Sequence, residues 1–435
     1  MPPKESADLL IEPRWVLPML PVNTALANHA VAVADGRIAA VGPIEQLTAR
    51  FTAREHIARP DHALLPGFVN AHTRAAAALF RGLPRAAAGS AEQRLAGPEL
   101  IKDATQIAIA EMLRAGITCF ADADLFPEET ARAAASAHVR AAVGLPVSDE
   151  PNPWAESSVA HLAKAEQLWD VYRSDPLVSL YFALPTPAAL SDATLSRVRR
   201  VADELDARVT MPVHESAARV QEGLAWDGRR PLQRLQALGL LRPGFGALHL
   251  AHLDESDLEI VTRTGMCAIS CPQSDLRQAG ALCPVARLEA SAVVVGLGTD
   301  SPIDGGALDI LAETRTAALL GARGDSASPG LSAAAALRMA TLGGASALGM
   351  SALIGSIEPG KAADLVCVDL SSLEFQRPVQ PAEAIVFAAT RMQVSDVWTS
   401  GRTAVSQGRL LTFDDHEMRS LGRRWTEHIR PEALA

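Results

Sequence analysis

The sequence predicts an α/β protein with a (β/α)8 TIM barrel at its centre and a smaller β domain built from both chain ends. Two patterns predict this arrangement. Between about residue 63 and residue 350, short apolar runs alternate with segments of helical period. Before and after that region, alternating apolar and polar residues are separated by glycine-containing turns, as is typical of antiparallel strands. With 435 residues, the chain has room for a barrel of roughly 250 residues and a further domain.

The two chain ends are expected to meet in one small composite β-sandwich domain. Residues 1–62 supply its N-terminal part, residues 63–350 form the barrel, and residues 351–435 supply the C-terminal part and a tail. Near the start, HAVAVA alternates, DG provides a turn and RIAAVG returns, which predicts a β-hairpin. Near the end, the strand-like stretches are GSIEPGKAADLVCVDL and SDVWTSGRTAVSQGRLLT.

Eight short apolar segments are the predicted barrel strands. In chain order they are LLPGFVNAH, ITCFADAD, HVRAAVGLPV, LVSLYFAL, RVTMPV, GALHLAHL, MCAISC and AVVVGLGTD. Segments such as ELIKDATQIAIAEMLRAG and DATLSRVRRVADELDA lie between them and have the period of amphipathic helices. Directly after the first strand, the stretch AAAGSAEQRLAG at residues 86–97 predicts a loop.

Composition and charge exclude several classes of partner. A net charge of −10 without any basic run argues against binding to nucleic acid or to an anionic membrane. No segment reaches the roughly 18 uninterrupted apolar residues of a membrane span, and the N-terminus has no apolar stretch of signal length. Five cysteines, an odd number, fit reduced thiols in the core of a cytoplasmic protein.

Polar side chains follow several predicted strands at the end where barrel proteins place their chemistry. Histidine, glutamate and aspartate side chains gathered at one barrel mouth are the ingredients of a metal-assisted hydrolase. These candidate residues are His72 on the first strand, His214 and Glu215 on the fifth, His249 and His252 on the sixth, and Asp300 on the eighth.

Seven motifs in order resemble those of the amidohydrolase superfamily: LLPGFVNAHTR, VHES, AHL, SCPQSDLR, GLGTDSP, ETRTAALL and IGSIEPGKAADLVCVDL. The nearest subgroup is the methylthioadenosine/S-adenosylhomocysteine deaminases with their triazine-hydrolase relatives, and the resemblance runs from about residue 8 to residue 411. It implies a zinc-dependent barrel that acts on C–N bonds of small purine-like or triazine-like rings. It also implies a homodimer or a larger homo-oligomer.

The resemblance assigns a role to each matching residue. It makes His72 and Asp300 metal ligands, Glu215 a proton shuttle and His249 the group that polarises the attacking water or the substrate. Two family ligands are replaced, because Arg74 stands at the second histidine of the first strand and Pro212 at the histidine of the fifth strand. Arginine stays protonated and proline has no side-chain donor atom, so neither residue binds a metal.

A further departure lies in the seventh-strand motif, where Asp275 replaces the usual asparagine. The sequence therefore predicts a protein that has lost zinc and the ancestral deaminase reaction and binds a small molecule or a partner. No cofactor is expected, and zinc is implied by the family resemblance alone. In this interpretation Arg74, His214 and His252 contact the ligand. We also expect Arg74 to supply the missing positive charge by pairing with the carboxylate of Asp300 or Glu215.

Two alternatives remain open from the sequence. The first is an active hydrolase with a reorganised site, in which Arg74 acts as the electrophile or a metal binds through His214 and His249. His214 lies two residues beyond Pro212 and so falls on the same strand face. The second alternative is a structural subunit that pairs with an intact relative.

Overall fold

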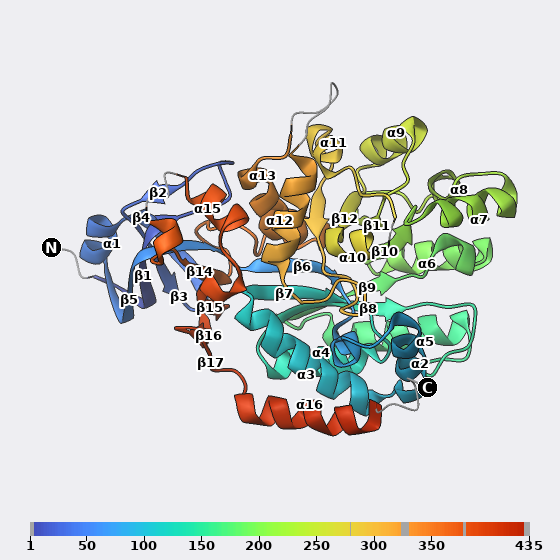
Figure 1. The fold of residues 1–435 in the computed structure, drawn as a ribbon, viewed down its shortest axis with the longest axis horizontal. Coiled ribbons are helices and arrows are strands. Elements are labelled where there is room, and N and C mark those ends of the chain that lie inside the picture. Colours follow the sequence, from blue (N-terminus) through green and yellow to red (C-terminus); the bar gives the residue numbers. More distant parts are fainter. Residues whose placement is uncertain (1–3, 279, 323–329, 377–379, 430–435) are drawn as a thin grey trace.

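The protein contains two sheets, one parallel and one mixed, joined side by side (Figure 1). The computed structural model describes residues 4–278, 280–322, 330–376 and 380–429. The parallel sheet has eight strands in chain order and the mixed sheet has nine strands from both chain ends. The predicted fold class, a barrel with an additional β unit made by the two chain ends, is confirmed.

The eight barrel strands coincide in order with the eight predicted segments. They are β6 (Phe68–Thr73), β7 (Ile117–Asp122), β8 (Arg140–Pro146), β9 (Val178–Ala183), β10 (Arg208–Val213), β11 (Phe245–His249), β12 (Cys267–Ser270) and β13 (Val295–Leu297). The first and last strands meet just beyond β13. There the N–H groups of Thr299 and Asp300 donate to the carbonyl of His72 at 3.0 and 3.1 Å. This contact brings the last candidate site residue beside the first.

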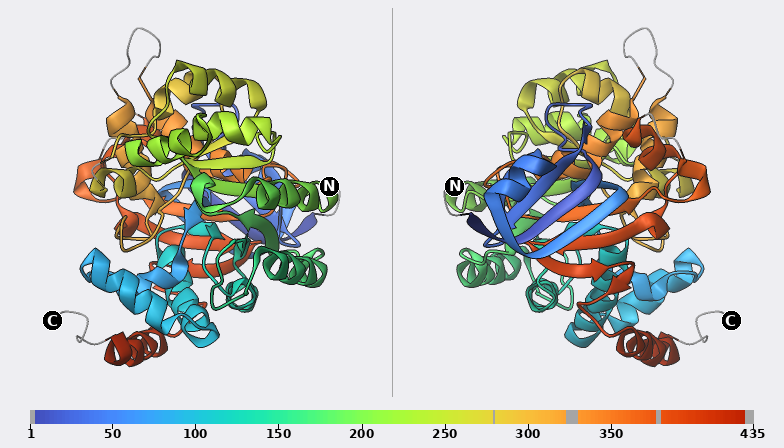
Figure 2. Two further views of the ribbon diagram at one scale, coloured as in Figure 1. Left: turned by 90° about the vertical axis from the view of Figure 1, so that its right-hand side faces the viewer. Right: turned by 90° about the vertical axis from the view of Figure 1, so that its left-hand side faces the viewer.

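Helices surround the barrel (Figure 2) and cover the outer face of its strands. Val209, Met211 and Val213 of β10 are buried in the core cluster between strands and helices, so the intervening Pro212 faces the barrel interior. The helices of this layer are α3 (Pro98–Arg114), α4 (Pro127–Ser136), α5 (Ser158–Tyr172), α6 (Asp192–Glu204), α7 (Ala217–Asp227), α8 (Pro231–Ala237), α9 (Glu255–Thr264), α10 (Pro272–Arg277), α11 (Val285–Ala290), α12 (Ile310–Gly321), α13 (Ala333–Arg338) and α14 (Gly344–Ala347), with the π-helical turn η3 (Met339–Gly343).

The predicted loop after the first strand is wrong. The 3-10 helix η1 (Ala75–Phe80) is followed by the α-helix α2 (Arg85–Leu95). The Ala, Gln, Arg and Leu residues of this stretch favour helix despite its glycine and serine. Ala88 and Ala91 are fully buried in a cluster with Phe80, so tertiary packing stabilises a helix that its composition alone leaves ambiguous.

The mixed sheet joins the two chain ends through β5, which pairs with β1 on one side and with β14 on the other. The predicted hairpin is β3–β4, and its turn residues Asp35 and Gly36 have φ of 50° and 72°, the left-handed region that favours glycine. The elements of this unit are β1 (Glu5–Val16), β2 (Leu26–Ala27), β3 (His29–Ala34), β4 (Arg37–Pro43), α1 (Ile44–Arg50), β5 (Phe51–Pro66), β14 (Leu365–Asp369), η4 (Leu373–Phe375), α15 (Pro381–Phe387), η5 (Arg391–Gln393), β15 (Val394–Thr399), β16 (Arg402–Ser406) and β17 (Arg409–Leu410).

The C-terminal tail leaves the mixed sheet and forms α16 (Asp415–Ile429) along α3 of the barrel (Figure 1). The indole N–H of Trp425 donates to the Asp103 carboxylate at 2.9 Å, which fixes the two helices together. All five cysteines are free and buried, as expected. Within the described ranges, no helix is both long enough and apolar enough to span a membrane.

Candidate active site

Several candidate residues lie where barrel strands end and the backbone turns sharply. His214, His249 and Asp300 have φ of 55°, 71° and 52°. Left-handed backbone is uncommon for residues other than glycine, and strained residues of this kind concentrate at functional sites. At these residues the backbone leaves the extended conformation, so strand pairing stops and the direction of each side chain is set by the turn.

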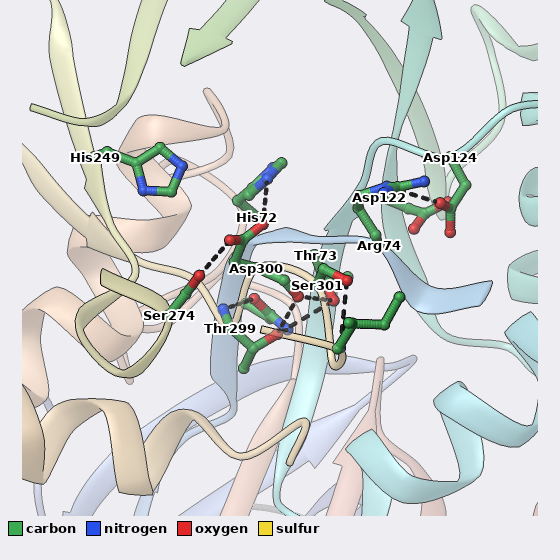
Figure 3. A network of polar contacts seen from close by, with 12 residues as sticks. His72, Thr73, Arg74, Asp122, Asp124, His249, Ser274, Thr299, Asp300 and Ser301 are labelled. Carbon is green, nitrogen blue, oxygen red and sulfur yellow. Dashed lines mark hydrogen bonds and ion pairs between the residues drawn. The ribbon is translucent and has the colours of Figure 1, made fainter. Parts of the chain in front are cut away.

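His72 and Asp300 face each other across the junction of the first and last strands (Figure 3). His72 Nε2 lies 3.5 Å from Asp300 Oδ1, and the Ser274 hydroxyl donates to Asp300 Oδ2. Burial raises the pKa of Asp300, but the His72 contact, the charge of His249 and the Ser274 hydrogen bond outweigh burial and hold the pKa below its usual range. Asp300 is therefore a carboxylate at neutral pH.

His249 is held by Asp275 of α10. His249 Nδ1 lies 2.7 Å from Asp275 Oδ1, and both side chains are buried. Burial lowers the pKa of His249, but the hydrogen bond and the charge of Asp275 outweigh burial and raise the pKa to about 9. His249 is thus an imidazolium at neutral pH, and it supplies a fixed positive charge on the same side of the mouth as Asp300.

Arg74 does not pair with Asp300 or Glu215, so that prediction is wrong. Its guanidinium contacts Glu92 of α2 through Nη2, and its Nε lies 3.3 Å from Asp124 Oδ1 beyond the end of β7 (Figure 3). Arg74 is the residue before η1, with φ −122° and ψ 86°, and its side chain runs toward β7 rather than toward β13. Side chains two residues apart on a strand face the same way, which would place Arg74 beside His72. β6 ends at Thr73, however, and Arg74 is the residue at which the chain enters η1.

Three carboxyl groups, those of Glu92, Asp122 and Asp124, surround the single guanidinium of Arg74. The Asp124 side chain is 1% exposed, and its Oδ2 accepts the Ala76 N–H at 2.8 Å. Burial and the neighbouring charge of Asp124 raise the pKa of Asp122 to about 8, so Asp122 holds a proton at neutral pH. Arg74 is consequently the cation that balances Asp124 and Glu92.

Replacing Arg74 with alanine should lower the free energy of unfolding by about 1–3 kcal/mol at pH 7. Breaking a buried pair costs roughly 3–5 kcal/mol, but the Arg74 side chain is 38% exposed and water screens part of the interaction. The loss should shrink toward pH 5, because burial raises the pKa of Glu92 and protonation removes the uncompensated charge. Chemical denaturation at both pH values measures this. Arg54→Ala, whose parent side chain is 83% exposed, is the control, and equal stability of the two variants would contradict the role of Arg74.

His214 points away from the mouth. Its ring is 1% exposed, its Nδ1 lies 3.3 Å from Asp257 Oδ2, and its Nε2 accepts the Leu232 N–H at 3.4 Å. The expectation that His214 shares the inward face of Pro212 is wrong, because β10 ends at Val213 and the left-handed backbone of His214 turns its ring toward α8 and α9. His214 is therefore placed as a structural residue.

Glu215 and His252 lie at the rim. Glu215 Oε1 accepts a hydrogen bond from Arg219 Nε at 3.0 Å, and the Glu215 side chain is 27% exposed. The contact that the structure gives His252 is through its backbone: its carbonyl accepts from Arg230 Nη2 at 2.8 Å, and its N–H donates to the His214 carbonyl. The structure thus brings His72, His249 and Asp300 together. Glu215 lies at the edge of this group, where its negative charge helps to raise the pKa of His249, and the hydrogen bonds that the structure gives His252 are those of its backbone.

A family comparison agrees with the barrel and its strand-end residues. The sequence model described as the amidohydrolase family matches residues 63–404. The chain belongs to the amidohydrolase family. A second model, the imidazolonepropionase-like composite domain of bacteria, matches residues 30–53 in the mixed sheet. The resemblance inferred from the motifs is confirmed.

Relatives in this family align over nearly the whole chain. A 5-methylthioadenosine/S-adenosylhomocysteine deaminase of Teredinibacter turnerae is 34% identical over 433 residues, covering 97% of this chain and 98% of the relative. The protein of the same name from Syntrophobacter fumaroxidans is 35% identical over 436 residues, covering 98% of this chain and 99% of the relative.

Solved structures show the same architecture. An adenosine deaminase from Xanthomonas campestris with bound zinc is 40% identical and has a TM-score of 0.96, covering 98% of this chain and all of that one. An atrazine chlorohydrolase from Arthrobacter aurescens complexed with zinc has a TM-score of 0.88 at 21% identity, covering 97% of this chain and all of the other; this likeness supports the fold alone.

Zinc-bound amidohydrolase structures raise the question whether this chain offers a zinc site. Zinc sites in proteins generally use at least three protein ligands. His72 and Asp300 are suitably placed, but Arg74 and Pro212 have no atom that binds zinc. Over the residues that the structure describes, no group of three His, Cys, Asp or Glu side chains could hold a metal ion. The donor set therefore does not fit zinc.

Several partners of the candidate residues in this amidohydrolase barrel were not predicted from the sequence. Asp124 and Ser274 stood inside the quoted segments ITCFADAD and SCPQSDLR, so their position at strand ends was the available signal. Glu92 lay in the stretch taken for a loop, and Asp257 lies on α9 with no strand-end signal. Each acts through a partner distant in sequence.

Proposed function

We propose that this amidohydrolase-family protein does not bind zinc with the ancestral ligand set and does not deaminate nucleosides. It binds instead a small nitrogen-rich ring, purine-like or triazine-like, at the barrel mouth. The observation that carries the proposal is the position of Arg74, which occupies the second ligand place and is fixed by Glu92 and Asp124.

The ring-binding part of the proposal rests on the two charged groups that remain. Asp300 is an acceptor, and His249 is an imidazolium whose Nδ1 is taken by Asp275, so a ligand would meet its Nε2–H. A donor and an acceptor at one barrel mouth suit the edge of a ring that carries an amino group next to a ring nitrogen. The relatives named for methylthioadenosine and S-adenosylhomocysteine support purine derivatives as the first ligands to test.

The alternative of an active hydrolase with a reorganised site has weaker support. A metal held through His214 would require its ring to leave Asp257 and Leu232. Arg74 as an electrophile would require it to leave Glu92 and Asp124. A cytoplasmic location and a homo-oligomeric state, or pairing with an intact relative, stay predictions.

The proposal is tested by comparing binding with turnover for the same compounds. We expect adenosine, 5′-methylthioadenosine and S-adenosylhomocysteine to release no ammonia above an Asp300→Asn control, even with zinc added. The Teredinibacter turnerae relative is the positive control for the assay. In calorimetry, Asp300→Asn should weaken binding of a purine ligand by about 10-fold, as expected for one charged hydrogen bond. Turnover that depends on zinc and on Asp300 would refute the loss of activity, and lack of binding by every purine and triazine would refute the ligand class.

A further inference from the structure

One short helix supports both charged groups of the mouth. Ser274 and Asp275 are neighbours on α10, where Ser274 donates to Asp300 and Asp275 holds His249. Consecutive helical residues point about 100° apart, so one helix reaches the end of β13 with one side chain and the end of β11 with the next. The orientation of Asp300 and His249 therefore depends on where α10 sits.

The first turn of α10 is anchored by Glu313 of α12. Glu313 Oε2 accepts the backbone N–H of Gln273 at 3.0 Å. Gln273 is the second residue of α10, and an N–H at this place has no acceptor within its own helix. A hydrogen-bond acceptor beside this N–H therefore stabilises the start of the helix. The Gln273 side chain adds one weaker contact to the hydroxyl of Thr316, at 3.3 Å.

Glu313 sits on a firmly held helix. The side chain of Asp309 accepts the Ala312 N–H at the start of α12. Two residues after Glu313, Arg315 donates through Nε to the Val386 carbonyl at 2.9 Å. Glu313 and Arg315 are the charged residues of the ETRTAALL motif, which the proposed ligand site does not itself use.

The burial of the Glu313 carboxyl group by itself lowers the stability of the fold. It is 1% exposed, and its second oxygen, Oε1, is buried without a hydrogen-bond partner from the described residues. A buried polar atom without a partner lowers stability, so an apolar residue here would pack at lower cost. A role in placing α10 explains why a carboxyl group stands at this position.

We propose that Glu313 is a positioning residue that sets the orientation of both Asp300 and His249 through α10. The inference goes beyond the proposed function and does not depend on it, because it concerns side-chain placement whether the mouth binds a ligand or reacts with it.

Histidine side-chain NMR tests this inference, since His72 reports on Asp300 and His249 reports on Asp275. The ring Cε1–H signals are assigned by replacing each histidine in turn with glutamine. At pH 7.5 we expect Ser274→Ala to shift mainly the His72 signal and Asp275→Asn to shift mainly the His249 signal. Glu313→Ala should shift both. Glu313→Gln, whose amide oxygen still accepts the Gln273 N–H, should leave both signals at the parent position.

A second pair of variants tests the same contact in case Glu313→Ala does not fold. Gln273→Pro removes both the glutamine side chain and the backbone N–H that Glu313 binds. Gln273→Ala removes only the side chain and keeps that N–H. The proline variant should shift both signals and the alanine variant neither. Signals of exposed histidines outside the barrel strands, such as His56 and His416, should stay in place in every variant. The inference is overturned if Glu313→Ala or Gln273→Pro folds and moves only one of the two signals, or neither, or if Glu313→Gln moves both.

Discussion

Replacing Arg74 and Pro212 together with histidine should give this protein a zinc site that it lacks. His72 Nε2 already lies 3.5 Å from Asp300 Oδ1, and Pro212 faces the barrel interior. The Arg74 side chain runs toward β7, where Glu92 and Asp124 hold its guanidinium. A histidine at 74 is shorter and free of those two contacts, so we expect it to turn toward His72 and, with histidine at 212, to complete a donor set of four, which meets the need of zinc for at least three ligands. Disturbing a residue behind a ligand typically changes metal affinity about 10–100-fold, so adding two ligands should tighten zinc binding by more than about 100-fold.

Competition with a coloured chelator measures that gain. The matched control is the double replacement of Arg74 and Pro212 with alanine, which removes the guanidinium and the proline but adds no ligand. Each single histidine variant should fall between the control and the double variant. If the histidine pair binds zinc no better than the alanine pair, the ends of β6 and β10 do not converge on one point, and the structural basis of the account fails.

The free energy of unfolding should fall as pH rises from about 6.5 to 9. The pKa of His249 is about 9 in the folded protein, above the value near 6.5 of a free histidine. A raised folded pKa gives stability that is complete below the unfolded pKa and is lost as pH rises through the folded pKa. His249 alone should therefore contribute a loss of about 3 kcal/mol over this range.

Two buried carboxyl groups add to the same trend. Burial, with the charge of Asp124 in the first case, raises the pKa of Asp122 and of Glu313 to about 8. Both therefore bind a proton more tightly in the folded chain, and their contribution is also lost as pH rises. Urea denaturation at pH 6.5, 8 and 9 measures the slope. His249→Gln should flatten it, and parallel curves for parent and variant would show that His249 is not held as an imidazolium.

The fold could be predicted because the residue patterns that define each strand, turn and helix lie within a few consecutive residues of the sequence. The hairpin β3–β4 follows from alternation and an Asp-Gly turn, and each barrel strand is a short apolar run between helices. The strand-end residues His72, His249 and Asp300 could be predicted to meet, because parallel barrel strands end on one face.

Side-chain direction at the strand ends could not be predicted in the same way. The two-residue alternation holds only while the backbone is extended, and the chain leaves that geometry at Arg74 and at His214. The partner of Arg74, Glu92, is 18 residues away on a helix that composition did not indicate. The support of α10 by Glu313 spans 40 residues and leaves no local pattern.

The metal content of the unaltered protein tests the central claim most directly. The protein is purified without chelator, incubated with excess zinc, passed through gel filtration and analysed by emission spectroscopy, with the zinc-bound Xanthomonas campestris adenosine deaminase treated alike. The account predicts that this protein retains far less than one zinc per chain while the deaminase retains its metal. About one zinc per chain in this protein, removed by Asp300→Asn, would contradict the account, because zinc sites generally need three ligands.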